Sequence, residues 1–111
     1  MKVKKEYIDL APAKIWDLIV DHINTNGKFF SVTGIEYKSK VLGLGGDQQI
    51  HFIGGSGGIR GTEGETIGKY KFINAYKEVC NDEISTASVE SYIKRQQTPF
   101  VGLLSSAGII E

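Results

Sequence analysis

Glycine is the feature of this chain that most restricts how it can fold. Ten of its 14 glycines lie between Gly43 and Gly68, and glycine disfavours regular helix because it loses more backbone freedom on folding than any other residue. The stretch cannot be regular helix. No linker, internal repeat or low-complexity segment divides the chain, and 111 residues can bury one hydrophobic core. The sequence therefore predicts a single domain, residues 1–111.

The residues before the glycine-rich stretch predict one helix. KKEYIDL, residues 4–10, fits a short edge strand. Pro12 then suits the first turn of a helix, since proline lacks only an amide proton that the first turn does not use. Apolar residues follow at helical spacing on one face, and Asn26-Gly27 ends the helix. The face consists of Ile15, Leu18, Ile19, His22 and Ile23.

A β-hairpin is predicted next, because the apolar period changes from about 3.6 to 2 at Ile35. Apolar and polar residues alternate from Ile35 to Val41, GLGGD reads as the hairpin loop, and QQIHFI reads as the returning strand. The alternation continues upstream of Ile35 in a different phase. This change of phase predicts a bulge at Gly34.

A helix is predicted after the glycine-rich stretch, from about Glu65 onward. Thr62 and Glu65 are spaced as a capping box. Strand is the alternative for the first residues, because Tyr70 and Phe72 also alternate with lysines. The predicted apolar face consists of Phe72, Ala75, Tyr76 and Val79.

Another helix is predicted over residues 85–95. Ser85 or Thr86 can cap its start, and Lys94 and Arg95 would lie near the negative end of its dipole. Its apolar face would hold Val89, Tyr92 and Ile93.

The last predicted helix follows a brief turn at Gln96-Gln97. Thr98 would cap it, Pro99 would open it, and Gly108 would end it. Its apolar face would hold Phe100, Leu103, Leu104 and Ala107. The predicted fold class is therefore α+β: an N-terminal helix with a β-hairpin, a glycine-rich connection, and a C-terminal three-helix half.

The composition excludes several classes of protein and site. The 13 basic and 13 acidic residues cancel, so no overall field favours polyanions or membranes. The nearest approach to a basic stripe is Lys28, Lys38 and Lys40 beside Glu36, which is weak. The single Cys80 excludes an internal disulfide and a multi-cysteine zinc site. No apolar run approaches the roughly 18 residues that a membrane span needs, so we expect no membrane partner and a cytoplasmic location.

Catalytic and metal-binding motifs are also missing from the sequence. Asp17, Asp21 and His22 form the nearest acidic cluster, but they lack the spacing of metal ligands. No motif for acyl, phosphoryl or glycosyl transfer occurs. We therefore expect a non-catalytic protein without a metal or another cofactor.

The glycine-rich loop IHFIGGSGGIRGTEGETI, residues 50–67, lacks the known phosphate-binding signatures. Arg60 stands where the third glycine of the dinucleotide fingerprint belongs, and no Lys-Ser or Lys-Thr follows as in a P-loop. Glu63 and Glu65 would also disfavour an anion at a helix start. A simple connection is the expected role. The alternative is a small-ligand or anion site formed by Arg60, His51 and the amides around Ser56, Gly57 and Gly58.

The last third of the chain, STASVESYIKRQQTPFVGLLSSAGIIE, resembles a helix-turn-helix or winged-helix half. The likeness concerns the pattern of a capped helix, a short turn, a second helix and an extended tail. It implies nucleic-acid binding, although the second helix has no charged residue between Pro99 and Ala107 for base contacts. The contacts would therefore fall to Lys94, Arg95, Gln96, Gln97, Lys69 and Lys71.

The leading hypothesis is a small non-catalytic domain for interaction or self-association. Trp16, Phe29, Ile53, Val101 and Ile109 fall off the predicted core faces, and clusters of such residues often mark association surfaces. We therefore expect a homo-oligomer or a protein partner. Weak nucleic-acid binding through the helix-turn-helix-like half is one alternative, and a ligand site at the glycine-rich loop is the other.

Overall fold

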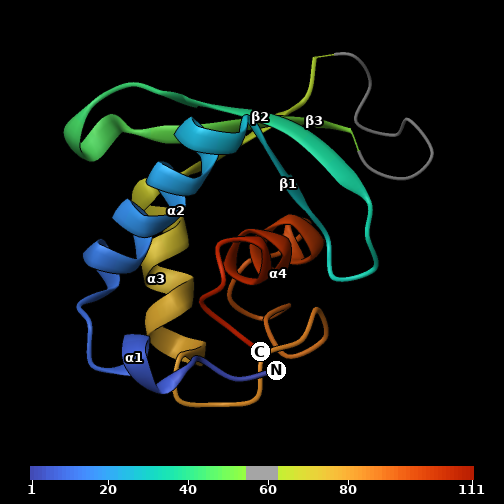
Figure 1. Ribbon diagram of the computed structural model, residues 1–111. Helices are drawn as coiled ribbons and strands as arrows, with labels where there is room; N and C mark the ends of the chain where they lie inside the picture. The colour runs from blue at the N-terminus through green and yellow to red at the C-terminus, as the bar shows by residue number, and fades with distance from the viewer. Residues whose placement is uncertain (55–62) are drawn as a thin grey trace.

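A four-stranded antiparallel sheet, with strand order β1-β2-β3-β4, carries helices on one of its faces. The computed structural model describes residues 1–54 and 63–111. Figure 1 shows the sheet above and α2, α3 and α4 below it, which confirms the α+β class. The elements are α1 Lys5–Ile8, α2 Pro12–Asn26, β1 Lys28–Phe30, β2 Glu36–Leu42, the 3-10 helix η1 Gly45–Asp47, β3 Gln49–Gly54, β4 Glu65–Gly68, α3 Lys69–Val79 and α4 Gln97–Ser106.

Helix α2 begins and ends where the sequence predicts. Pro12 is its first residue, and Gly27 follows its last residue with a left-handed φ of 67°. The Gly27 N–H donates to the Ile23 carbonyl at 2.7 Å, which satisfies an acceptor at the helix end. Trp16 and Val20 are buried together with the predicted apolar face, whereas Leu18 is exposed.

The predicted β2–β3 hairpin is confirmed. Val41 lies opposite Ile50, and Ser39 lies opposite Phe52, so the apolar sides of the two strands share one face. Gly43 in the loop has a φ of 76°, and a Cβ at this position would lie 2.7 Å from the carbonyl oxygen of Asp47. The loop therefore requires glycine for both its conformation and its close backbone approach.

Two predictions for the N-terminal half are wrong. Residues 4–10 contain the short helix α1 rather than a strand; the Ile8 N–H donates to the Lys4 carbonyl at 3.1 Å. The strand-like pairing belongs to Val3, which lies opposite Ile110. Gly34 forms no bulge, because it lies in the turn between β1 and β2 with a φ of 93°.

The segment Glu65–Gly68 is strand β4, not the start of a helix. Its alternative interpretation as a strand is the correct one, because Ile67 pairs with Ile50 of β3 and both side chains are buried. Helix α3 begins only at Lys69, after the cap residue Gly68. The predicted capping box therefore does not start this helix; its Thr62 lies outside the described residues.

The predicted helix over residues 85–95 is also wrong, so the C-terminal half has two helices, α3 and α4, among its described elements. The segment forms consecutive turns instead. The Ser85 N–H donates to Ser88 Oγ at 2.9 Å, and the Ser88 N–H donates to Ser85 Oγ at 3.1 Å. This reciprocal pair has the geometry of a capping box at Ser85, and the Val89 N–H donates to the Ser85 carbonyl at 3.2 Å, but no continuous helix follows. Val89 and Ile93 are buried as predicted, but Tyr92 is exposed.

Helix α4 runs beneath the sheet from one edge strand to the other. Gln96 at its start donates from Nε2 to the Thr66 carbonyl of β4 at 2.9 Å. Ser106 at its end bonds the Phe30 backbone of β1, accepting from N at 2.8 Å and donating to O at 3.0 Å. Ten helical residues rise about 15 Å, close to the roughly 14 Å that four strands span. The helix length thus matches the width of the sheet.

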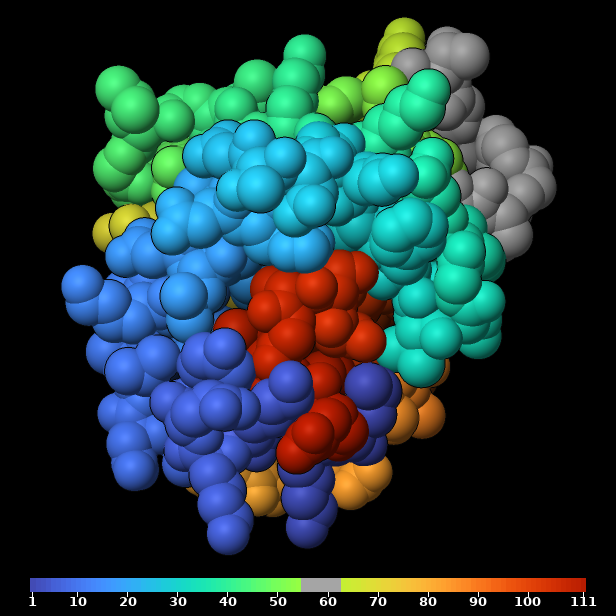
Figure 2. Space-filling view, in the orientation of Figure 1, coloured from blue at the N-terminus to red at the C-terminus, as the bar shows by residue number. Residues whose placement is uncertain are grey.

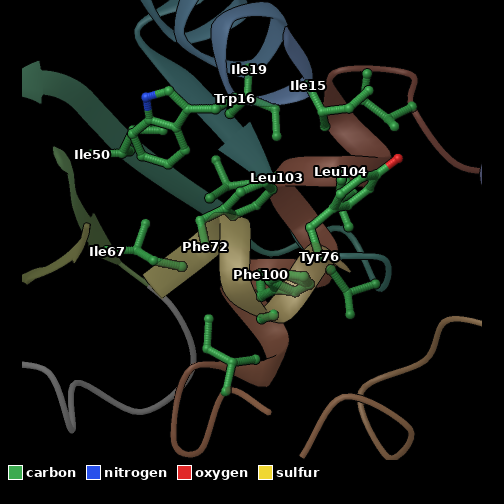
Figure 3. Packing of buried hydrophobic residues seen from close by; sticks show 14 of the residues in the cluster. Ile15, Trp16, Ile19, Ile50, Ile67, Phe72, Tyr76, Phe100, Leu103 and Leu104 are labelled. Atoms are coloured by element: carbon green, nitrogen blue, oxygen red, sulfur yellow. The ribbon is translucent and has the colours of Figure 1, made fainter. Parts of the chain in front are cut away.

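The hydrophobic core fills the space between the sheet and the helices (Figure 3). The Phe72 ring lies 5.4 Å from Trp16 and 4.9 Å from Phe100, centroid to centroid, so it joins three helices. Trp16 Nε1 donates to Gln48 Oε1 at 2.7 Å, which satisfies the buried indole. Figure 2 shows the C-terminal segment packed between the N-terminal helices and the β1–β2 turn.

The two ends of the described chain lie side by side (Figure 1). The Lys2 N–H donates to the Glu111 carbonyl at 2.8 Å, and the Glu111 N–H donates to the Lys2 carbonyl at 3.0 Å. The Met1 ammonium group also pairs with Glu83. These contacts tie the first residues to the last and complete the helical layer.

Candidate functional site

The most distinctive surface is the face of the sheet that the helices leave uncovered, called here the outer sheet face. Strand residues alternate between two faces, and the inward set in β1, β2 and β3 includes Phe29, Tyr37, Ile50 and Phe52, all buried. The outward set is exposed, apart from the half-buried His51. This outer sheet face consists of Lys28, Phe30, Glu36, Lys38, Lys40, Leu42, Gln49, His51, Ile53 and Thr66.

Strand pairing concentrates positive charge on the outer sheet face. Lys28 of β1 lies directly opposite Lys38 of β2, and Lys40 lies opposite His51 of β3. Like charges placed opposite one another, as Lys28 and Lys38 are, destabilise a sheet, so stability alone does not account for this pairing. The sequence contained the signal as a lysine stripe, but the register of three strands was needed to bring the stripe beside His51.

An open hollow of about 460 Å³ lies over these residues. Within the described part of the chain, Glu36 is the one carboxylate that lines it, and it pairs with Lys28 at 3.6 Å. No salt bridge within those described residues involves Lys38 or Lys40. The hollow is lined by Gly27, Lys28, Glu36, Lys38, Ser39, Lys40, His51 and Ile53.

His51 lines the hollow and also anchors the chain that leads into β4. Its Nε2 lies 2.8 Å from the Glu63 carbonyl oxygen, and because a carbonyl only accepts, Nε2 carries the proton. Gly64 packs so tightly here that a Cβ would lie 3.1 Å from His51 Cε1 and 2.4 Å from the Phe52 carbonyl oxygen. The ring is therefore held in place by the backbone around it.

The other residues of the predicted ligand site at the glycine-rich loop lie outside the described residues. They are Arg60, Ser56, Gly57 and Gly58. Their predicted companion His51 belongs to the outer sheet face.

Phe30 places an aromatic ring on the outer sheet face. The side chain is 40% exposed, and the Lys28 ammonium group lies 5.7 Å from its ring centroid. Ser106 bonds both backbone polar atoms of Phe30. The ring therefore stands on a fixed backbone, next to a cation.

The predicted nucleic-acid residues of the C-terminal half are only partly brought together. Gln96 is buried at 6% exposure; its Oε1 accepts from Lys71 Nζ at 2.9 Å and its Nε2 donates to Thr66. These bonds use Gln96 to cover the free edge of β4. Lys94 and Arg95 are exposed just before it, and Gln97 is half-buried.

Lys69, the remaining member of that predicted set, lies elsewhere. It lines a second hollow of about 380 Å³ at the start of α3, together with Tyr70, Lys71 and Asp47. The helix before α4 that the helix-turn-helix resemblance implies is not formed. All residues of α4 from Pro99 to Leu104 are buried, so this part of the helix offers no exposed face for reading bases.

Two of the remaining titratable candidates, His22 and Cys80, have local structural partners. His22 Nδ1 lies 3.2 Å from Asn26 Nδ2, and burial lowers the pKa of the imidazole. Cys80 is half-buried and donates from Sγ to the Lys77 carbonyl at 3.7 Å. Asp17 and Asp21 are exposed on α2. In residues 1–54 and 63–111, no three side chains of His, Cys, Asp or Glu gather as a metal site.

Four of the five apolar residues interpreted as a self-association surface lie in the core. Trp16, Phe29, Val101 and Ile109 are at most 1% exposed. Ile53 is 36% exposed and lies on the outer sheet face. These residues therefore do not form one apolar patch. No helix in the described part of the chain has the length and apolar character needed to cross a membrane.

Comparison with known proteins assigns no family. No family model matches this chain, and neither a curated protein nor a solved structure matches it at a significant level. Function is therefore inferred from the geometry of the chain itself.

Proposed function

We propose that this domain is a non-catalytic nucleic-acid-binding module, and that its outer sheet face carries the residues that contact phosphate. The supporting observation is that Lys28, Lys38 and Lys40 lie around one hollow. Among the described residues, Glu36 is the one carboxylate that lines this hollow. Lysines that neutralise phosphates supply the sequence-independent part of nucleic-acid affinity. An open face with several cations suits a polymer with repeating charges better than a small enclosed ligand.

The outer sheet face is better suited to this role than the C-terminal cluster, which consists of Lys71, Lys94, Arg95, Gln96 and Gln97. Lys38 and Lys40 are exposed and lie on the same side of one strand, about 7 Å apart along it. In the C-terminal cluster, the Lys71 ammonium group is bonded to the buried Gln96. The helix that should read the bases is buried as well.

The test is an anisotropy titration of a labelled oligothymidylate over several salt concentrations. Three lysine contacts predict a slope of log affinity against log salt of about −2, because each contact with a single strand contributes about −0.7. The double variant Lys38→Ala/Lys40→Ala should make the slope shallower by about 1.4. The matched control Lys14→Ala/Lys77→Ala removes the same charge from exposed positions of the helical layer and should retain the wild-type slope.

Each alternative outcome has a definite meaning. No binding of single-stranded or duplex nucleic acid at low salt rejects the proposal. Equal losses in the test and control variants would show that only net charge matters, which also rejects the site. A larger loss in Lys94→Ala/Arg95→Ala would assign binding to the C-terminal cluster instead. A solution mass above one 12.2 kDa chain, without nucleic-acid binding, would favour self-association.

A further inference from the structure

We infer that the outer sheet face selects single-stranded over duplex nucleic acid, with the Phe30 ring as a stacking surface for one base. This inference rests on the proposed function and adds that the nucleic acid is single-stranded. The observation behind it is an exposed aromatic ring beside the lysines, on a sheet face whose other side chains are mostly polar.

Phe30 differs from the other rings of the described strands in its direction. Phe29, Tyr37 and Phe52 point inward and contact one another, with centroids 4.8 to 5.8 Å apart. Phe30 points outward and leaves 40% of its surface exposed. An outward ring can stack on a base, and such stacking tolerates any base because every base has a flat π-face.

The backbone beneath the ring is rigid. Ser106 Oγ bonds both N and O of Phe30, at 2.8 and 3.0 Å. Gly102 lies so close that a Cβ there would be 2.8 Å from the Phe30 carbonyl oxygen. Helix α4 thus holds the Phe30 backbone from below. A base that stacks on the ring does not have to order this backbone, which lowers the cost of binding.

The charges around the ring fit a nucleotide stacked upon it. Lys28 lies 5.7 Å from the ring centroid and 3.6 Å from Glu36, so its ammonium group is kept beside the ring. Lys38 lies directly opposite Lys28 on the next strand. A base on the ring would therefore have two cations nearby for its own phosphate and the next one.

The shape of the surface favours a single strand. Bases within a duplex are paired and stacked, so their faces are hidden from a protein ring. Reading a duplex requires a helix or ribbon that enters a groove, whereas the outer sheet face is a broad sheet surface with exposed side chains. An unpaired strand can lay its bases and phosphates across such a surface.

The experiment compares affinities for oligothymidylate and for the corresponding thymidylate–adenylate duplex at one salt concentration. Wild-type protein should prefer the single strand. Phe30→Ala and Phe30→Leu should weaken single-strand binding by about tenfold and leave duplex binding nearly unchanged. Tyr92→Ala, which removes an exposed ring that lies outside the outer sheet face, is the control and should retain wild-type affinity.

Phe30→Trp restores a ring and provides a direct signal. Trp16 is fully buried, so quenching of exposed tryptophan emission by oligothymidylate reports on position 30. Quenching with near wild-type affinity is expected, and circular dichroism checks that each variant is folded. If Phe30→Ala does not fold, the comparison of Phe30→Leu with Phe30→Trp decides the question.

The failure of this inference is distinguishable from failure of the proposed function. Equal single-strand affinity for Phe30→Leu and wild type, or no quenching in Phe30→Trp, overturns the stacking role. Equal affinity of the wild type for both nucleic acids overturns the selectivity. Either result still supports the lysine contacts if Lys38→Ala/Lys40→Ala makes the slope of log affinity against log salt shallower. If the wild-type protein binds neither single-stranded nor duplex nucleic acid, both this inference and the proposed function are overturned.

Discussion

Gly102 allows helix α4 to lie directly against the backbone of β1, and Gly102→Ala tests this packing. A Cβ at position 102 would lie 2.8 Å from the Phe30 carbonyl oxygen and 3.1 Å from Ser31 Cα. Both atoms belong to the backbone, so neither can move aside as a flexible side chain would. The helix or the strand must shift as a whole.

Two opposing effects determine the size of the change. Alanine favours a helix interior over glycine by about 1 kcal/mol. Overpacking typically costs about 1–3 kcal/mol, and displacement of α4 also lengthens the two bonds between Ser106 and Phe30, each worth about 1 kcal/mol. The clash and the weakened bonds outweigh the helix preference. We expect Gly102→Ala to lower the free energy of unfolding by about 2 kcal/mol.

Urea denaturation followed by Trp16 fluorescence measures this change, because the buried indole becomes exposed on unfolding. Ser105→Ala in the same helix is the control and should stay within about 0.5 kcal/mol of wild type. A Gly102→Ala protein as stable as wild type, or more stable, would refute the close approach of α4 to β1.

Three further substitutions test other parts of the structure. Gln96→Ala should lower the free energy of unfolding by about 2 kcal/mol, because it leaves the Thr66 carbonyl and the Lys71 ammonium group without this partner; a Gln97→Ala loss of equal size in urea denaturation would contradict this. Burial lowers the pKa of His22 from 6.5, so the folded protein takes up this proton less readily than the unfolded chain. The contribution of His22 should be complete above about pH 7 and decline as the pH falls through its lowered folded pKa; an identical stability–pH profile for His22→Gln would reject this. Burial, and secondarily the charge of Cys80, raises the pKa of Tyr76 to about 12, and no described residue bonds its buried hydroxyl. Tyr76→Phe should therefore leave the free energy of unfolding, measured by thermal denaturation, unchanged or raise it by up to about 1 kcal/mol. A clear loss would reveal a bonded hydroxyl.

Local signals in the sequence were sufficient to predict an element whose start and end depend on its own residues. Pro12 and Gly27 bound α2 because each has a backbone preference that acts without distant contacts. The β2–β3 hairpin follows from the period-two pattern and from Gly43, whose conformation the loop requires. The Lys38 and Lys40 part of the predicted lysine stripe follows for the same reason, since residues two apart share a strand face.

Tertiary contacts decided the segments with ambiguous local patterns. Glu65–Gly68 is a strand because it pairs with the edge of β3. Residues 85–95 form separate turns although the Ser85–Ser88 pair has the geometry of a capping box. The periodicity places Trp16, Phe29, Val101 and Ile109 off the predicted core faces, because a single helix or strand period describes burial against one neighbour. In the fold, these residues pack against several neighbours.

The sequence by itself thus determined the α+β class, α2, the central hairpin and the alternation that places Lys38 and Lys40 on one face. The tertiary structure alone placed Lys28 opposite Lys38, put His51 beside Lys40, and set Phe30 on a backbone held by Ser106, which lies 76 positions away. The physical reason is that backbone preferences and side-chain periodicity act over a few residues. Strand register and helix-to-sheet packing join residues far apart in the chain, and they are determined only when the whole core is assembled.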